Sequence, residues 1–195
     1  MRYGSEHKAE TRQRILDIAS RRFREEGVDA VGVASLMADA GLTHGGFYAH
    51  FKSKEELVAA AVGTALAESH SRIKRIADSA ENGIETYIDA YLSPAHRDAV
   101  ADGCCFAALG ADLSRHEDPA RAVMDGELDP YLSWIGTLLP ATDPASVRRQ
   151  SAALFSLLMG TLQLARLATD REQSDSILDS GRKAALQLIS VFQGV

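Results

Sequence analysis

The spacing of apolar residues constrains the fold of this chain more than any other feature. Through long segments these residues recur every three or four positions, and no stretch alternates with a period of two. Recurrence near 3.6 places apolar side chains on one face of an α-helix, whereas a half-buried strand needs strict alternation. Glycine and proline are sparse inside the same segments. The sequence therefore predicts an all-α protein with about nine helices.

Helix-end signals predict three helices in residues 1–53. The first covers about residues 9–26 and ends at Gly27, and the second covers about residues 33–40. Gly-Leu-Thr then turns the chain, and Thr43 is placed to be the N-cap of a third helix that extends through Phe51. We expect these helices to form one small domain.

The rest of the chain, residues 54–195, is also predicted to be helical. Ser53 and Glu56 form a capping box that opens a long helix reaching about residue 77. Asp118–Pro119 and Asp143–Pro144 each place an N-cap residue before a proline at the first helical position, and Pro130 is expected to kink or break the segment between them. Further helices are expected over about residues 82–94, 102–115, 144–168 and 174–192.

Charge is distributed unevenly along the chain. The formal net charge is −6, which by itself argues against a nucleic-acid partner. Residues 1–54, however, hold more basic than acidic side chains, and residues 40–54 contain no acid at all. A basic N-terminal part on an acidic body indicates a polyanionic partner for the first part. The alternative is an ordinary solvated surface.

Two consecutive glycines in GLTHGGFYAHF (Gly41–Phe51) stand where the third helix should begin. Each glycine inside a helix destabilises it by about 0.8–1 kcal/mol relative to alanine. Two glycines here therefore indicate that a backbone without side chains is needed at this point. Two short helices joined by a turn that contains Gly41 fit a helix-turn-helix motif, whose second helix enters the major groove of DNA. Glycines at its first turn would let this helix approach the duplex closely, and its free N–H groups would favour phosphate oxygens.

On this hypothesis the segment has a buried side and a DNA-facing side. The small core is expected to comprise Leu36, Met37, Ala40, Leu42, Phe47 and Phe51. The DNA-facing set is expected to comprise Thr43, His44, Gly45, Gly46, Tyr48, Ala49, His50 and Lys54. Thr43 and His44 are candidates to read base edges, and Ala49 to touch a thymine methyl group. Tyr48, His50 and Lys54 suit contacts to the DNA backbone. The alternative is a glycine loop that only packs on its neighbours.

The segment GLTHGGFYAHFKSKEELV resembles the helix-turn-helix signature of the tetracycline-repressor (TetR) family, in which a turn leads into Tyr-x-His-Phe and then Ser-Lys-x-x-Leu. The resemblance covers about residues 10–58. It implies a DNA-binding domain over residues 1–53 and a helical ligand-binding and dimerisation domain over residues 54–195. One departure is Gly32, where the family commonly has a threonine or serine that caps the second helix.

The same resemblance implies a transcriptional regulator, more often a repressor, that binds a palindromic DNA operator as a homodimer and is released by a small-molecule effector. The last two helices would supply the dimer interface. Small residues would let these helices approach closely at Gly160, Gly181, Ala184 and Ala185. Larger residues would fill the seam at Leu154, Leu158, Leu188 and Phe192. The alternative is that both are ordinary core helices of a monomer.

A pocket for the effector is expected in the helical body. The residues that could line it are Tyr87, Tyr91, Cys104, Cys105, Phe106, Trp134, Met159 and Gln163. This set favours a hydrophobic or aromatic compound. Aromatic residues at helical spacing are, however, more often core residues than ligand contacts, and that alternative stays open.

The two cysteines, Cys104 and Cys105, are adjacent, which argues against a disulfide framework. At the start of a helix the N-terminal dipole would stabilise a thiolate. Cys104 is therefore a candidate sensor of an oxidant or electrophile, with its modification standing in for ligand binding. The alternative is that both are small buried hydrophobic residues. Adjacent cysteines point apart on a helix, and no histidine pair has ligand spacing, so we expect no metal site and no cofactor.

Other classes of protein have less support. Cys104 with His116 or His96 could make the nucleophile and base of an enzyme, but no orienting motif, phosphate loop or recognisable carboxylate pair accompanies them. A helical adaptor would not need a basic N-terminal part. No apolar run approaches the roughly 20 residues of a membrane helix, and the N-terminus lacks the apolar stretch of a signal peptide. We therefore expect a cytoplasmic, non-enzymatic protein with no membrane partner.

Overall fold

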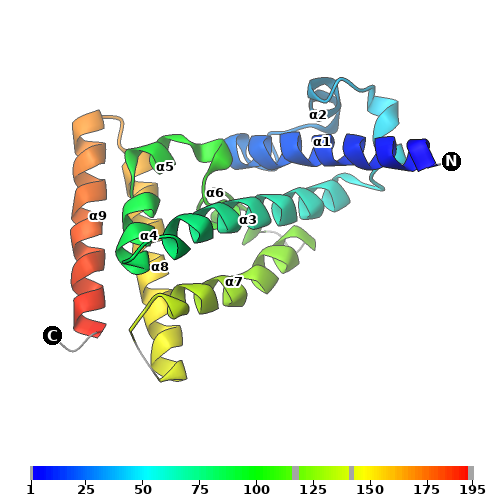
Figure 1. The fold of residues 1–195 in the computed structure, drawn as a ribbon. Helices are drawn as coiled ribbons and strands as arrows, with labels where there is room; N and C mark the ends of the chain where they lie inside the picture. The colour runs from blue at the N-terminus through cyan, green and yellow to red at the C-terminus, as the bar shows by residue number, and fades with distance from the viewer. Residues whose placement is uncertain (1, 116–118, 141–142, 193–195) are drawn as a thin grey trace. The chain divides into compact units, whose positions relative to one another are not determined.

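The computed structural model describes residues 2–115, 119–140 and 143–192. All regular structure in these residues is helical (Figure 1), which confirms the predicted all-α class. None of the helices in the described ranges is long and apolar enough to cross a membrane. The chain divides into two compact units, Met1–Ser69 with Val100–Asp125, and His70–Ala99 with Gly126–Val195.

The first unit holds the N-terminal helices and the short helices from the middle of the chain. Its elements are α1 (Arg2–Glu26), α2 (Val33–Asp39), η1 (His44–Ala49), most of α3 (Lys54–Asp78), η2 (Val100–Asp102), α6 (Cys105–Leu113) and the start of α7 (Pro119–Thr137). Within this unit α1 packs against α2, η2 and α6.

The second unit holds the C-terminal helix pair and the helices that cover it. Besides the ends of α3 and α7, its elements are α4 (Gly83–Tyr91), α5 (Pro94–Asp98), α8 (Pro144–Leu167) and α9 (Arg171–Phe192). α8 and α9 pack against one another, and α4 contacts both (Figure 1).

Several predicted helix ends are confirmed by their backbone geometry and caps. α1 ends at Gly27, whose φ of 86° is costly for any residue with a side chain. The Glu56 N–H donates to Ser53 Oγ at 3.3 Å, and the Glu56 carboxylate accepts from the N–H of Lys52 at 2.8 Å. This is a capping box whose return bond is displaced by one residue. Asp143 caps α8 by accepting from the Ser146 N–H at 2.8 Å.

Three predicted boundaries differ from the structure. α1 begins at Arg2 instead of near residue 9, because polar helix formers extend a helix without adding to its apolar pattern. The helix expected over residues 82–94 is α4, which ends at Tyr91, since Ser93 caps the separate helix α5 and Pro94 occupies the first turn of α5. Pro130 lies inside α7 and does not break it, and the kink expected there stays a prediction. The helix continues through buried Tyr131 and Trp134, whose packing offsets one lost backbone hydrogen bond.

The close approach expected of the last two helices occurs inside one chain. A Cβ added at Gly181 would overlap the side chain of Thr161 on α8, so only glycine fits there. Leu154 and Leu158 on α8 and Ala185 on α9 are buried in the same unit. The prediction that Leu154 and Leu158 fill a seam between two chains is therefore wrong, because they belong to the core of their own chain.

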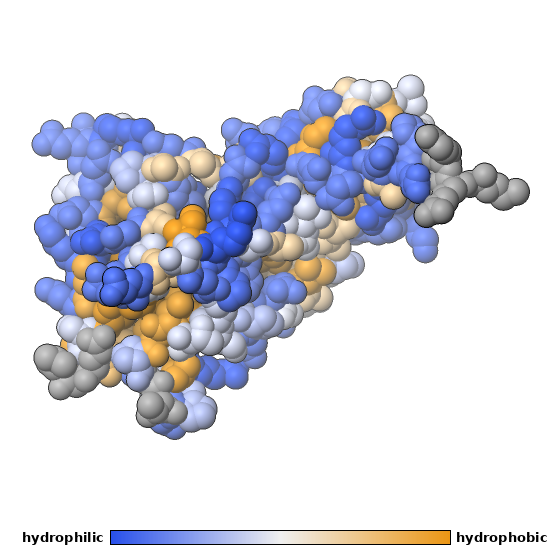
Figure 2. All heavy atoms as spheres, in the orientation of Figure 1, coloured by the Kyte–Doolittle hydropathy of each residue, from blue (hydrophilic) through white to orange (hydrophobic). Residues whose placement is uncertain are grey.

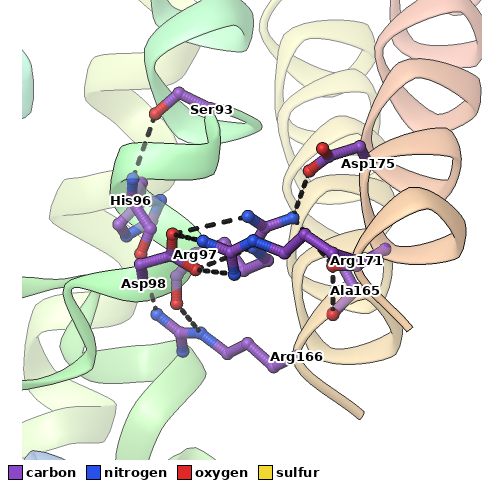
Figure 3. A network of polar contacts seen from close by, with 9 residues as sticks. Ser93, His96, Arg97, Asp98, Ala165, Arg166, Arg171 and Asp175 are labelled. Atoms are coloured by element: carbon purple, nitrogen blue, oxygen red, sulfur yellow. Dashed lines mark hydrogen bonds and ion pairs between the residues drawn. The ribbon is translucent and has the colours of Figure 1, made fainter. Parts of the chain in front are cut away.

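A polar network joins α5 to the helix pair in the second unit (Figure 3). Buried Arg97 donates to Ser174 Oγ at 2.8 Å, to Asp175 Oδ1 at 2.5 Å and to Asp98 Oδ1 at 2.8 Å. Asp98 also accepts from Arg171 at 2.5 and 2.9 Å. Hydrogen bonds from Arg97 and then Arg171 hold the pKa of Asp98 well below its ordinary value.

The end of α8 joins the same network through backbone atoms. Arg166 donates to the carbonyl oxygens of His96 at 3.2 Å and Arg97 at 3.1 Å. Ser174 donates to the Ala165 carbonyl at 2.7 Å, which ties the start of α9 to α8. α5 is thus a short strap over the α8–α9 turn, and the turn is held in one geometry (Figure 3).

His96 sits in this strap as a neutral imidazole. Its Nδ1 lies 2.7 Å from the Tyr91 carbonyl oxygen, which can only accept, so Nδ1 carries the proton. Burial lowers the pKa of His96 from 6.5 to about 4, and the positive charges of Arg166 and Arg72 act in the same direction. The hydrogen bond to Tyr91 opposes this shift.

We predict that His96 makes the protein less stable in acid. Between pH 6.5 and about 4 the unfolded chain binds a proton at His96 and the folded chain does not, so the free energy of unfolding falls as the pH falls. The loss is at most about 3 kcal/mol. His96→Asn keeps a donor for the Tyr91 carbonyl but cannot titrate. Urea unfolding at a series of pH values should show a shallower decline for this variant, and parallel curves would contradict the assignment.

Candidate nucleic-acid interface

The turn between α2 and η1 is built as a helix-turn-helix motif requires. Ala40 closes α2, and Gly41 adopts a φ of 72°, a left-handed conformation that favours glycine. The N–H of Gly41 donates to the Ala38 carbonyl at 2.9 Å, and that of Leu42 donates to the Met37 carbonyl at 2.8 Å. These bonds reverse the chain within two residues and bring η1 back against α2.

A stacked aromatic pair fixes η1 on the domain core. Phe47 and Phe51 are both buried, and their rings stack with centroids 5.7 Å apart and an interplanar angle of 27°. Leu36 and Met37 are buried beside them. Ala40 is buried and Leu42 half-buried, so the predicted small core is confirmed.

The third helix differs from the prediction in type and length. It is a 3-10 helix over His44–Ala49, and Thr43 stands at its N-cap without a side-chain hydrogen bond. The predicted N-cap position of Thr43 is confirmed, but its hydroxyl does not cap the helix. Two glycines in the first turn weaken an α-helix, and i→i+3 bonds such as Gly46 N–H to Thr43 carbonyl, at 3.0 Å, close the turn instead.

The exposed side of this segment is termed the η1 surface and consists of Thr43, His44, Gly45, Tyr48 and Ala49. Tyr48 is 68% exposed. Its ring meets Phe47 edge-on at 5.3 Å between centroids, and His44 in the same way at 6.4 Å. The buried Phe47 thus orients an exposed tyrosine that could otherwise rotate freely.

The fold of the chain gives no reason for a glycine at position 45. A Cβ added there would meet nothing within 4 Å, and Gly45 does not have a positive φ. At Gly46 the nearest atoms would be Thr43 Oγ1 at 3.7 Å and Met37 Cε at 3.8 Å, which are ordinary contacts. Packing inside the chain therefore does not require a glycine at position 45, and the missing side chain affects only the exposed surface.

Lys54 and His50 flank the η1 surface and are half-buried. The Lys54 ammonium donates to the Val28 carbonyl at 2.9 Å, which occupies one of its three donors. The Nδ1 atom of His50 is buried and has no hydrogen-bond partner. Burial lowers the pKa of His50, and the charges of Lys8 and Arg12 lower it further. The imidazole is therefore neutral at neutral pH.

Two anchors of this domain escaped the sequence-based reasoning. Arg22 on α1 donates to Asp39 Oδ2 at 2.8 Å and to Ser35 Oγ at 3.0 Å, and so holds α2. Its bidentate bond to Glu26, at 2.6 and 2.9 Å, follows the i,i+4 pattern and was the only visible signal. These bonds reinforce a helix whose N-cap, Gly32, offers no side-chain cap.

The second anchor joins the end of α1 to α6. Asp112 accepts from the N–H of Val28 at 3.2 Å, while the Val28 carbonyl accepts from Lys54. Buried Arg24 donates to the Gly103 carbonyl at 3.4 Å. The turn after α1 is thereby held from two sides, and no short sequence pattern signals a contact over such separations.

The residues predicted to line an effector pocket fall into two groups. In the second unit, Tyr87, Tyr91 and Trp134 are buried, with Tyr87 meeting Trp134 at 5.4 Å and Tyr91 at 5.8 Å between ring centroids. Tyr131 was missed, and its hydroxyl lies 3.2 Å from that of Tyr87. His70 was also missed and meets the Tyr131 ring edge-on at 4.9 Å. On α8, Met159 and Gln163 are half-buried.

The other group lies in the first unit at the start of α6. Cys104 is the N-cap of this helix, Cys105 is its first residue, and both are buried free thiols beside buried Phe106. Burial raises the pKa of Cys105 to about 12, which makes its thiolate rare. A thiol sensor would therefore have to be Cys104.

Of the two histidines considered as a catalytic base for Cys104, the structure describes only His96. His116, a candidate base for Cys104, lies outside the described residues, as does Asp118. The Nδ1 of His96 donates to Tyr91. In the part of the chain that the structure describes, no group of three or more His, Cys, Asp or Glu side chains is placed to hold a metal ion.

Comparison with known proteins agrees with this geometry. Residues 15–61 match the model for bacterial regulatory proteins of the tetR family. A TetR transcriptional regulator from Chloroflexus aurantiacus J-10-FL superposes with a TM-score of 0.80 over 95% of this chain and 96% of its own, at 23% identity. Residues 15–61 therefore form a helix-turn-helix domain of the tetR family type, and this match spans less than half of the chain. At this identity the superposition concerns the fold, and the family's helix-turn-helix segment is the part that carries α2 and η1.

Named relatives match the chain to different extents. The HTH-type transcriptional regulator AcrR of Shigella flexneri is 46% identical over 48 residues, covering 25% of this chain and 22% of that protein. The HTH-type transcriptional repressor NemR of Escherichia coli K12 is 26% identical over 180 residues, covering 87% of this chain and 90% of that protein. The higher identity, to AcrR, is thus confined to 22% of the length of that protein. The similarity to NemR extends over most of both chains, but the identity is lower.

Proposed function

We propose that this chain is a TetR-family transcriptional repressor that binds a palindromic DNA operator as a homodimer. A small-molecule effector releases it, with modification of Cys104 as the alternative trigger. Residues 1–53 are the DNA-binding domain and residues 54–195 the ligand-binding and dimerisation domain. The observation that carries the proposal is the η1 surface, which is exposed, free of acids and fixed from behind by the Phe47–Phe51 stack. Such a repressor acts in the cytoplasm, where bacterial DNA lies.

Each residue of the η1 surface, and each of its neighbours Gly46, His50 and Lys54, has a role that suits its chemistry. Thr43 and His44 read base edges in the major groove, and Ala49 meets a thymine methyl group. Gly45 and Gly46 allow the backbone to approach the duplex. Three further residues bind phosphates and set the register of the protein on DNA: Tyr48, His50 and Lys54.

The outer faces of α8 and α9 suit a dimer interface. On α8, apolar or small residues recur on one exposed side at Ala153, Leu157, Gly160, Leu164 and Leu167. On α9, a matching stripe comprises Ile177, Ala184, Leu188 and Val191. Leu164, Leu167 and Val191 are 58%, 77% and 70% exposed, and Figure 2 has hydrophobic spheres at the surface where α8 and α9 lie. Two copies that meet through these stripes would form a four-helix bundle.

The aromatic cluster of the second unit supports an aromatic or hydrophobic effector. Tyr87 and Tyr131 offer hydroxyl groups beside the ring of Trp134, and the Nε2 atom of His70 is buried without a hydrogen-bond partner. A planar ligand with one polar group would satisfy this atom and stack on the rings. Cys104, Cys105 and Phe106, also candidates for effector contact, belong to the first unit.

The DNA-binding roles predict two different mutant phenotypes. Lys54→Ala should weaken binding to all duplexes alike and lower the slope of log affinity against log salt by about 1 for each chain bound. His44→Ala should leave that slope unchanged and relax the base preference, with a loss of about 1–3 kcal/mol of discrimination. Anisotropy titrations with a selected operator and a scrambled duplex measure both. Equal behaviour of the two variants on both duplexes would contradict the assigned roles.

The dimer surface predicts a separate effect on assembly. Leu164→Glu places a charge in the middle of the α8 stripe and should convert the dimer to monomers in sedimentation velocity. Ala122→Glu adds the same charge at an exposed position of α7, a helix that carries neither stripe, and should leave the dimer intact. A wild-type monomer, or a Leu164→Glu dimer, would refute this interface.

A further inference from the structure

We infer that Lys8 and Arg12 on α1, together with His50, form a second phosphate-binding site that extends the DNA contact beyond η1. The inference rests on the proposed DNA-binding function and adds residues that the helix-turn-helix motif does not contain. Its ligand is a backbone phosphate of duplex DNA, which any sequence presents.

Arg12 connects α1 to the element that carries the η1 surface. Its guanidinium lies over the Phe51 ring, 4.8 Å from the centroid, and Phe51 stacks on Phe47 within η1. A cation over an aromatic face is held by the ring quadrupole and keeps its N–H edge free to donate. Arg12 is thus fixed relative to η1 although it belongs to another helix.

Lys8 stands one turn before Arg12 on α1 and is exposed. Arg12 lies over Phe51, the residue that follows His50, and the positive charges of Lys8 and Arg12 both lower the pKa of His50. The Nδ1 atom of His50 is buried, which leaves Nε2 as the ring atom that a ligand can reach. Figure 1 shows the first turns of α1 beside the segment between η1 and α3.

Lys8 and Arg12 differ from the three arginines in the second half of α1. Arg21, Arg22 and Arg24 each pair with a carboxylate, namely Asp102, Glu26 and Asp39, and Glu68. Within the described residues, Lys8 and Arg12 make no ion pair with a carboxylate. Like charges held close together disfavour one another, and a bound anion would remove that cost. A DNA phosphate supplies such an anion and can accept bonds from all three groups.

The test compares Lys8→Ala with Arg14→Ala. Both residues are exposed cations on α1, but Arg14 lies on another side of the helix and does not act on His50. Arg12→Gln, which removes the charge but keeps a polar side chain with N–H donors, serves as the second variant. The full-length dimer is titrated with a fluorescent duplex at several KCl concentrations, using a selected operator and a scrambled duplex of equal length.

Lys8→Ala and Arg12→Gln should each lower the salt slope by about 1 for each chain bound, equally on both duplexes. Arg14→Ala should keep the wild-type slope. If wild-type protein binds with the expected salt dependence and Lys8→Ala matches Arg14→Ala, the second site is wrong while the proposed function stands. If wild-type protein binds no duplex, the proposed function fails and the inference fails with it.

Discussion

The stack of Phe47 on Phe51 is the interaction on which the DNA-binding account depends. Both rings are buried, while Tyr48, His44 and Gly45 in the same segment are exposed. A six-residue 3-10 helix has little stability of its own. Its position is set by the two rings and by the turn at Gly41, so loss of either ring would release the whole exposed segment at once.

The η1 surface is tied to the rest of the first unit through a few polar bonds. The turn after α1 is held by Asp112 from α6 on its N–H side and by Lys54 from α3 on its carbonyl side. Arg12 adds a third link from α1 to Phe51. An effector that shifts α6 would therefore act on the same short turn that supports α3 and its lysine. This gives regulation a physical route made of hydrogen bonds between named residues.

Sequence reasoning succeeded where the deciding interaction is local. The burial of Phe47 and the caps at Ser53 and Asp143 follow from patterns within four residues. It failed where distant residues decide. Contacts between separate helices decide three features that were not predicted. These are the 3-10 form of η1, the contact of the Tyr131 hydroxyl with that of Tyr87, and the burial of Leu158 inside its own chain. Among the candidate site residues, exposure of the η1 surface could be predicted, and the bond from Lys54 to Val28 could not.

The most direct test adds a side chain where the fold does not forbid one. Gly45 and Gly126 both have open space at the Cβ position, and Gly126 lies on α7, so Gly126→Leu is a matched control for Gly45→Leu. Thermal unfolding and duplex binding are measured on the same samples. The account predicts unchanged folding for both variants and a loss of duplex affinity of at least about tenfold, or 1.4 kcal/mol, for Gly45→Leu alone. Wild-type affinity in Gly45→Leu would contradict it.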